Sequence, residues 1–192
     1  MAYEYDVFFS YKRDPQSDDW HRTVKEKLEF LLRLELAQPN LSVFFDTEEI
    51  STGLNWKEKV AEATKKSKCL IGIWSPLYFQ SKWCLSEWKS FRERELRWRC
   101  NVVVAASYHD GKHFPPDAQS KQVMDFSNFT STMAGFWSTT RAVDFEPMLK
   151  KFAADAAIII RAAPAYDEAF PIAEAVDQDL LPAGDIGRPA DG

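Results

Sequence analysis

Apolar residues along the chain form short continuous runs that alternate with longer stretches of helical periodicity. The short runs are rich in valine, phenylalanine and isoleucine, the residues that strands favour. They lie at Tyr5–Ser10, Leu41–Phe45, Cys69–Trp74, Asn101–Ala106 and Val123–Phe126. Because the runs are continuous rather than alternating, we expect strands buried on both faces, as in a parallel sheet covered by helices.

The stretches between these runs predict amphipathic helices. In Asp18–Leu36, apolar residues recur every three or four positions behind an acidic start. Asn55–Lys66 repeats this arrangement, with Asn55 as the expected N-cap, and Ser81–Arg99 and Phe145–Arg161 complete the set. Strands that alternate with helices predict an α/β fold.

Composition divides the chain into a body, residues 1–161, and an acidic tail or linker, residues 162–192. The tail contains four of the ten prolines and has seven acidic residues and one arginine, a net charge of −6. Since the whole chain carries −5, the body carries +1. A nearly neutral body argues against a nucleic-acid partner bound through its phosphates. Large apolar residues in the tail, among them Tyr166, Phe170 and Ile172, offer a means of docking on the body.

Several classes of protein are disfavoured by what the sequence lacks. No apolar run reaches the roughly 18 residues of a membrane span, and the start does not have the order of a signal peptide, so we expect a cytoplasmic protein. Neither glycine-rich phosphate-binding motif is present, and neither is the serine hydrolase elbow. His109 and His113 fall in an expected loop, where we predict no metal site. Three scattered cysteines suggest buried reduced thiols.

One carboxylate stands out. In a helix over Ser81–Arg99, the neighbours of Glu87 three and four positions away are Trp83, Cys84, Ser90 and Phe91, and none is a cation. An indole beside a carboxylate excludes water and strengthens its attraction for a bound cation. The alternative is a solvated Glu87 beside a core tryptophan. We expect the other tryptophans to be core residues, and the charged run Arg92–Arg99 to be a solvated face.

The motifs, taken together and in order, resemble a Toll/interleukin-1 receptor (TIR) domain of the bacterial, NAD-consuming type. EYDVFFSYKRD is similar to the first strand of that family and the loop after it. LSVFFDTEEISTGLNWKEKVAEA is similar to its second strand, its BB loop and the following helix, and KKSKCLIGIWSPLYFQSKWCLSEW to its third strand and W-x-x-x-E segment. The resemblance covers roughly residues 4–161 and implies a flavodoxin-like, five-stranded parallel sheet flanked by helices.

The resemblance also implies roles for particular residues. Glu87 corresponds to the catalytic glutamate, and we assign Trp83 to stacking on the base of the substrate. The other expected substrate-binding positions belong to the loop after the first strand and to the pocket wall and BB loop. They are Tyr11, Lys12, Arg13, Phe44, Asp46, Gly53 and Leu54. Arg13 suits phosphate best, because its guanidinium can bind two oxygens.

The implied function is that of an NAD+ glycohydrolase or an ADP-ribose cyclase, in antiphage immunity or cell suicide. NAD+ is then the substrate, and no other cofactor is expected. The resemblance implies activation by self-association through TIR–TIR contacts that include the BB loop. The chain has nothing like a sensor domain. We therefore expect either a stand-alone bacterial-type effector, or a domain that receives its signal from a sensor or effector protein or from another copy.

Two other readings remain open. The first is a non-catalytic TIR scaffold that signals through TIR–TIR contacts. The second is a phosphotransfer or nucleotide-binding flavodoxin-like protein, for which only Asp46, Glu48 and Glu49 approach the acid cluster expected at strand ends.

Overall fold

The computed structural model describes residues 2–45 and 56–175, and within them a five-stranded parallel sheet. The strands are β1 (Tyr5–Tyr11), β2 (Val43–Phe45), β3 (Ser67–Trp74), β4 (Val103–Ser107) and β5 (Val123–Asp125). Their order across the sheet is β2-β1-β3-β4-β5, and every pairing is parallel. This is the doubly wound, flavodoxin-like order, so the predicted fold class is confirmed.

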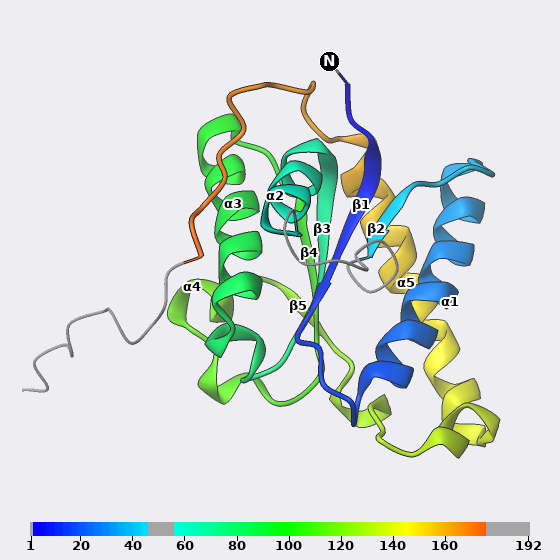
Figure 1. Ribbon diagram of the computed structural model, residues 1–192. Coiled ribbons are helices and arrows are strands. Elements are labelled where there is room, and N and C mark those ends of the chain that lie inside the picture. Colours follow the sequence, from blue (N-terminus) through cyan, green and yellow to red (C-terminus); the bar gives the residue numbers. More distant parts are fainter. Residues whose placement is uncertain (1, 46–55, 176–192) are drawn as a thin grey trace, which may run out of the picture.

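Helices cover both faces of the sheet (Figure 1). One face carries α1 (Asp18–Leu36) and α5 (Thr140–Arg161), and the other carries α2 (Trp56–Lys66) and α3 (Lys82–Trp98). A short α4 (Pro116–Gln119) lies between β4 and β5. Burial on both faces explains the continuous apolar runs, since the five central residues of β1 are all buried.

The predicted boundaries hold best where the apolar stripe is long. The bounds of α1 agree with the prediction, and α3 differs by one residue at each end. α5 begins five residues earlier than predicted and continues through Pro147. Because Pro147 and Val143 are exposed, the carbonyl that loses its helical partner faces water, and the helix tolerates the proline. The proposed N-cap, Asn55, lies outside the described residues.

Three of the tryptophans predicted to be core residues are buried. Trp20, Trp74 and Trp88 are at most 4% exposed, whereas Trp98, also predicted to be a core residue, is only half-buried, as is Trp83. Gly72 in β3 makes room for one of them, because a Cβ atom there would lie 2.4 Å from Nε1 of Trp74.

The prediction of a solvated face for Arg92–Arg99 was wrong at two positions. Arg94 is fully buried and Glu95 is 5% exposed. The guanidinium of Arg94 donates to the carbonyls of Thr64 (2.9 Å) and Ser67 (2.7 Å), where α2 ends and β3 begins. Oε1 of Glu95 accepts from the backbone N–H groups that lead into β4 and from Lys121. Both side chains can be buried because each forms hydrogen bonds with backbone groups that are themselves shielded from water.

The first part of the predicted tail, residues 162–175, lies on the body. It crosses the end of the sheet where the strands begin and then follows α3 (Figure 1). Phe170 is 3% exposed, with its ring 4.0 Å from the Arg94 guanidinium and 5.1 Å from the Trp98 ring. The backbone of Ala173 exchanges hydrogen bonds with the hydroxyls of Ser86 and Ser90 on α3. The boundary at residue 161 stays a prediction.

The remaining predictions concern the cysteines, two histidines and membrane-spanning helices. Cys69 and Cys84 are buried free thiols, as expected, while Cys100 is half-buried. His109 and His113 are exposed in and around a 3-10 turn, and residues 2–45 and 56–175 contain no group of three potential metal ligands. None of the described helices combines the length and hydrophobicity needed to cross a membrane.

Candidate functional site

The carboxylate of Glu87 lies where α3 crosses the end of β1. Ser81 caps α3, accepting a hydrogen bond from the Cys84 N–H, and Glu87 follows in the second turn. Ser10 is the last residue but one of β1, so it reaches the edge of the sheet at which parallel strands end. In an open α/β sheet, ligands bind in the crevice at this edge.

Glu87 is buried against a strand hydroxyl rather than solvated. It is 8% exposed, and the Ser10 hydroxyl donates to its Oε2 at 2.5 Å. Oγ of Ser10 also lies 2.8 Å from the hydroxyl of Tyr78, in the 3-10 turn Tyr78–Gln80. A carboxylate in this position is oriented by the protein before any substrate arrives, which is the arrangement that electrostatic catalysis requires.

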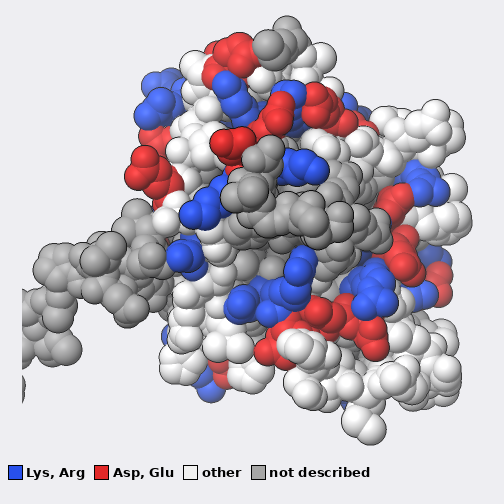
Figure 2. Space-filling view, viewed as in Figure 1, with Lys and Arg blue, Asp and Glu red and all other residues white. Residues whose placement is uncertain are grey.

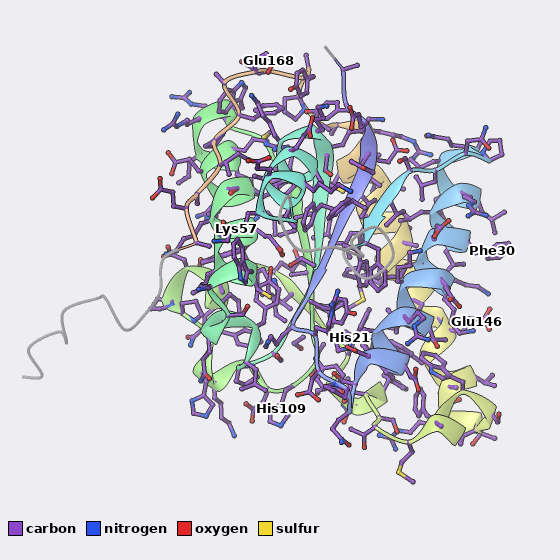
Figure 3. All side chains as sticks on the ribbon, viewed as in Figure 1. His21, Phe30, Lys57, His109, Glu146 and Glu168 are labelled. Atoms are coloured by element: carbon purple, nitrogen blue, oxygen red, sulfur yellow. The ribbon has the colours of Figure 1, made fainter. Side chains whose placement is uncertain are left out.

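Trp83 lies one turn before Glu87 on the same helix. Its side chain is half-buried, and Nζ of Lys57 and of Lys82 lie 5.7 Å and 5.9 Å from its ring centroid. The face of an indole attracts cations, so the ring that holds these ammonium groups also suits a positively charged pyridinium. Figure 3 shows Lys57 on α2, and Figure 2 shows lysine and arginine side chains around the middle of the same face.

The predicted residues of the first loop have different surroundings. Tyr11 stacks between Phe45 (5.5 Å between ring centroids) and His21 (4.4 Å), so much of its ring is used in packing. Lys12 is half-buried and Arg13 is exposed. Lys12 lines a cavity together with His21 and Tyr108, and Arg13 faces solvent.

The predicted pocket wall is described in part. Phe44 in β2 is 1% exposed, with its ring against those of Phe8 and Tyr5, so the structure places it in the core. Asp46, Gly53 and Leu54 lie outside the described residues. Their assignment to the pocket and BB loop, like that of Phe44, stays a prediction.

Sequence comparison identifies the family. Residues 7–137 match the family model described as TIR domain. This chain belongs to the TIR domain family. The match spans β1 to the turn before α5, and so includes Ser10, Trp83 and Glu87.

Individual relatives of this TIR domain are distant. It is 31% identical over 80 residues to the probable 2′ cyclic ADP-D-ribose synthase TcpO of Methanobrevibacter olleyae. That alignment covers 42% of this chain and 21% of TcpO, so the chain spans about a fifth of the relative.

Solved TIR structures are similar at low identity. The TIR domain of the Toll-related receptor TRR-2 from Hydra magnipapillata is 16% identical, with coverage of 77% of this chain and 98% of that one (TM-score 0.44). The TIR domains of the activated Roq1 resistosome are 20% identical, covering 81% and 85% (TM-score 0.42).

Sequence reasoning missed Ser10, the polar partner of Glu87 in this TIR domain, and Tyr78, the partner of Ser10. A signal for Ser10 was present. Alternate strand residues share a face, so Ser10 points to the same side as Phe8, whose ring lies 6.1 Å from that of Phe91 on α3. A serine near the end of a buried strand, on the side that packs against a helix, predicts a polar partner on that helix. Tyr78 carries no comparable signal, because its position depends on the 3-10 turn.

A cavity adjoins the first loop of this TIR domain. It has a volume of about 400 Å³ and is lined by Lys12, His21, Leu77 and Tyr108, among others. His21 and His109 mark its position at the end of the sheet where the strands finish (Figure 3). Lys12 links this cavity to the loop beside the Glu87 site.

His21 makes the stability of this TIR domain depend on pH. It is 3% exposed, its Nδ1–H donates to the Ser17 carbonyl, and it stacks on Tyr11 and Tyr108. Burial lowers the pKa of His21 from 6.5 to about 4. The unfolded chain therefore binds more protons between these values, so stability is complete above pH 6.5 and falls as the pH drops towards 4. We expect His21 to remove about 2 kcal/mol of unfolding free energy between pH 7 and pH 5.

Urea unfolding at each pH measures this effect. His21→Phe retains an aromatic ring and cannot titrate, so its stability should change less over that interval. His109→Gln, which alters an exposed histidine, should keep the wild-type pH dependence. Equal slopes in the wild type and His21→Phe would contradict the prediction.

Proposed function

We propose that this TIR domain cleaves the bond between nicotinamide and ribose in NAD+. The observation that carries the proposal is the buried Glu87 carboxylate, held by Ser10 at the carboxyl edge of the sheet, one helical turn from an indole that attracts cations. The family match and the similarity to TcpO, a probable 2′ cyclic ADP-D-ribose synthase, support the same class of chemistry.

A single carboxylate is sufficient for this reaction. Nicotinamide in NAD+ is bound to ribose as a positively charged pyridinium, so the breaking bond leaves its electron pair on nicotinamide, which departs as a neutral molecule. Ordinary glycoside hydrolysis needs a second carboxylic acid to protonate the leaving oxygen, and that requirement is absent here. Glu87 binds the ribose hydroxyls and stabilises the positive charge that develops on the sugar. Trp83 stacks on the base.

The product depends on what captures the ribosyl cation. Water adds to the sugar carbon and loses a proton, which gives ADP-ribose. A nitrogen or hydroxyl of the same molecule gives a cyclic isomer instead. A role in antiphage defence or cell suicide, with activation by self-association and a sensor or effector partner, completes the proposal.

The test is nicotinamide release from NAD+ by the purified protein at several protein concentrations, with the products separated by chromatography. We expect release whose specific activity rises with protein concentration, and ADP-ribose or a cyclic isomer as the partner product. No release even at concentrations that force association would overturn the proposal.

A non-catalytic scaffold is the second candidate. Exposed apolar side chains on α1 and α5 favour it, since Phe30, Leu34 and Val143 are 58%, 62% and 67% exposed. They line a hollow of about 660 Å³ between the two helices, and Glu146 also lines it. Figure 3 labels Phe30 and Glu146 on this side of the molecule. Association without NAD+ cleavage would favour this candidate.

A further inference from the structure

Three buried polar groups form a chain that ends at Glu87. The hydroxyl of Tyr78, the hydroxyl of Ser10 and Oε2 of Glu87 follow one another at 2.8 Å and 2.5 Å. Tyr78 is fully buried, Ser10 is 2% exposed and Glu87 is 8% exposed. They come from three different elements, the 3-10 turn after β3, the end of β1 and the second turn of α3.

Counting protons fixes the direction of both hydrogen bonds. An ionised carboxylate only accepts, so the single hydroxyl proton of Ser10 is donated to Glu87. Oγ of Ser10 must then accept the proton of Tyr78. Burial raises the pKa of Tyr78 well above its ordinary value, so the phenol remains a donor at every physiological pH. Each bond in such a chain polarises the next, which strengthens the bond to the carboxylate.

We infer that Ser10 and Tyr78 are positioning residues for the Glu87 carboxylate. The inference rests on the proposed function and names the groups that make Glu87 effective. The hydrogen bond from Ser10 stops rotation of the carboxylate, so that it meets the substrate in one orientation. The same bond favours the ionised form of Glu87 against the burial that disfavours charge, and only the ionised form stabilises a ribosyl cation.

Removing the serine hydroxyl should impair turnover more than binding. A hydrogen bond to a charged group in a buried site corresponds to about a 10- to 100-fold effect, so we expect Ser10→Ala to lower kcat by that factor with little change in KM. Ser10→Thr keeps the hydroxyl and should recover most of the activity. Tyr78→Phe keeps the ring and the Ser10 bond, so its loss should be smaller than that of Ser10→Ala.

The pH profile distinguishes positioning from a general loss of structure. The Tyr78 phenol and the Cys84 thiol both interact electrostatically with Glu87, and burial raises the pKa of that thiol to about 12. Lys12 adds a positive charge near that thiol. Because the Ser10 hydroxyl donates to the ionised carboxylate, its removal should move the acid limb of kcat to higher pH in Ser10→Ala.

Matched controls carry the same chemical change elsewhere. Ser67→Ala removes a buried serine hydroxyl that bonds the Ala63 carbonyl at the other end of the sheet, and Tyr3→Phe removes a tyrosine hydroxyl that bonds the Pro164 carbonyl. Both should retain wild-type kcat and an unshifted acid limb.

A double-mutant cycle in urea tests the contact without activity. We expect the stability effects of Ser10→Ala and Glu87→Gln to be non-additive, because the first removes the donor of this bond and the second removes the charge on its acceptor. Additive effects, or a wild-type kcat and acid limb in Ser10→Ala, would overturn the positioning roles while leaving NAD+ cleavage intact. If the wild-type protein did not cleave NAD+, the proposed function would be overturned instead. The double-mutant cycle would still show whether the Ser10 hydroxyl interacts with Glu87.

Discussion

Glu87→Gln should reduce nicotinamide release from NAD+ by at least about 1000-fold. Glutamine has nearly the same shape, so it retains the packing of α3 and loses the negative charge. Loss of a single donor in an oxyanion hole lowers the rate roughly 100- to 1000-fold. Glu87 is only 8% exposed, so loss of its full charge opposite a developing cation should lower the rate at least as much. The measurement is nicotinamide formed per unit time, with urea unfolding of both proteins to show that the variant is folded.

Glu93→Gln is the matched control for this variant. Glu93 lies on the same helix, but its side chain is 47% exposed in a surface pair with Arg97. The control should keep wild-type turnover, since exposed ion pairs contribute little. If Glu87→Gln retained more than a tenth of the activity while folded, the carboxylate that stabilises the ribosyl cation would have to be sought elsewhere.

The sequence was sufficient to predict the framework of this site. Periodic apolar residues in Ser81–Arg99 predicted a helix on which Trp83 and Glu87 lie one turn apart, and the structure has that helix at Lys82–Trp98. Continuous apolar runs predicted strands, and a parallel sheet places the end of β1 beside the start of α3. These features follow from local periodicity, which a sequence displays directly.

Contacts between distant segments were the part that could not be predicted. Ser10 and Glu87 are 77 positions apart, and only the register of β1 and the packing of α3 bring them to 2.5 Å. Likewise, Arg94 lies in a run of alternating charges that is typical of a solvated face. The sequence does not show that the last carbonyls of α2 lie opposite it without water.

Arg94→Ala should lower the free energy of unfolding by about 3 to 5 kcal/mol. The guanidinium is fully buried and donates to the carbonyls of Thr64 and Ser67. Alanine would leave both acceptors buried without a donor, and each such loss costs roughly 1 to 3 kcal/mol. Burial lowers the pKa of Arg94 to about 10, so the side chain stays charged at neutral pH. Its positive charge also stabilises the C-terminus of α2, the negative end of the helix dipole.

Packing adds to this effect. The guanidinium lies between the rings of Phe91 and Phe170, at 4.5 Å and 4.0 Å from their centroids. Phe170 belongs to the segment that follows α5, so the side chain joins α2, β3, α3 and this segment. Arg94→Met fills much of the space without donating hydrogen bonds. It should therefore lose less unfolding free energy than Arg94→Ala, and the difference measures the packing contribution. Arg94→Lys retains the charge but not the planar guanidinium that donates to two carbonyls, and its free energy of unfolding should fall by about 1 to 3 kcal/mol.

Arg97→Ala provides the control, one turn later on the same helix. Its side chain is 58% exposed in a surface pair with Glu93, so the change should stay within about 0.5 kcal/mol. Urea unfolding followed by tryptophan fluorescence gives the free energies, with unchanged m-values as the sign that both end states are comparable. Arg94 lies seven residues after Glu87, on the same face of α3. The residue that anchors α3 to the body therefore also fixes the face that presents the carboxylate, and an Arg94→Ala protein as stable as Arg97→Ala would show that the anchor lies elsewhere.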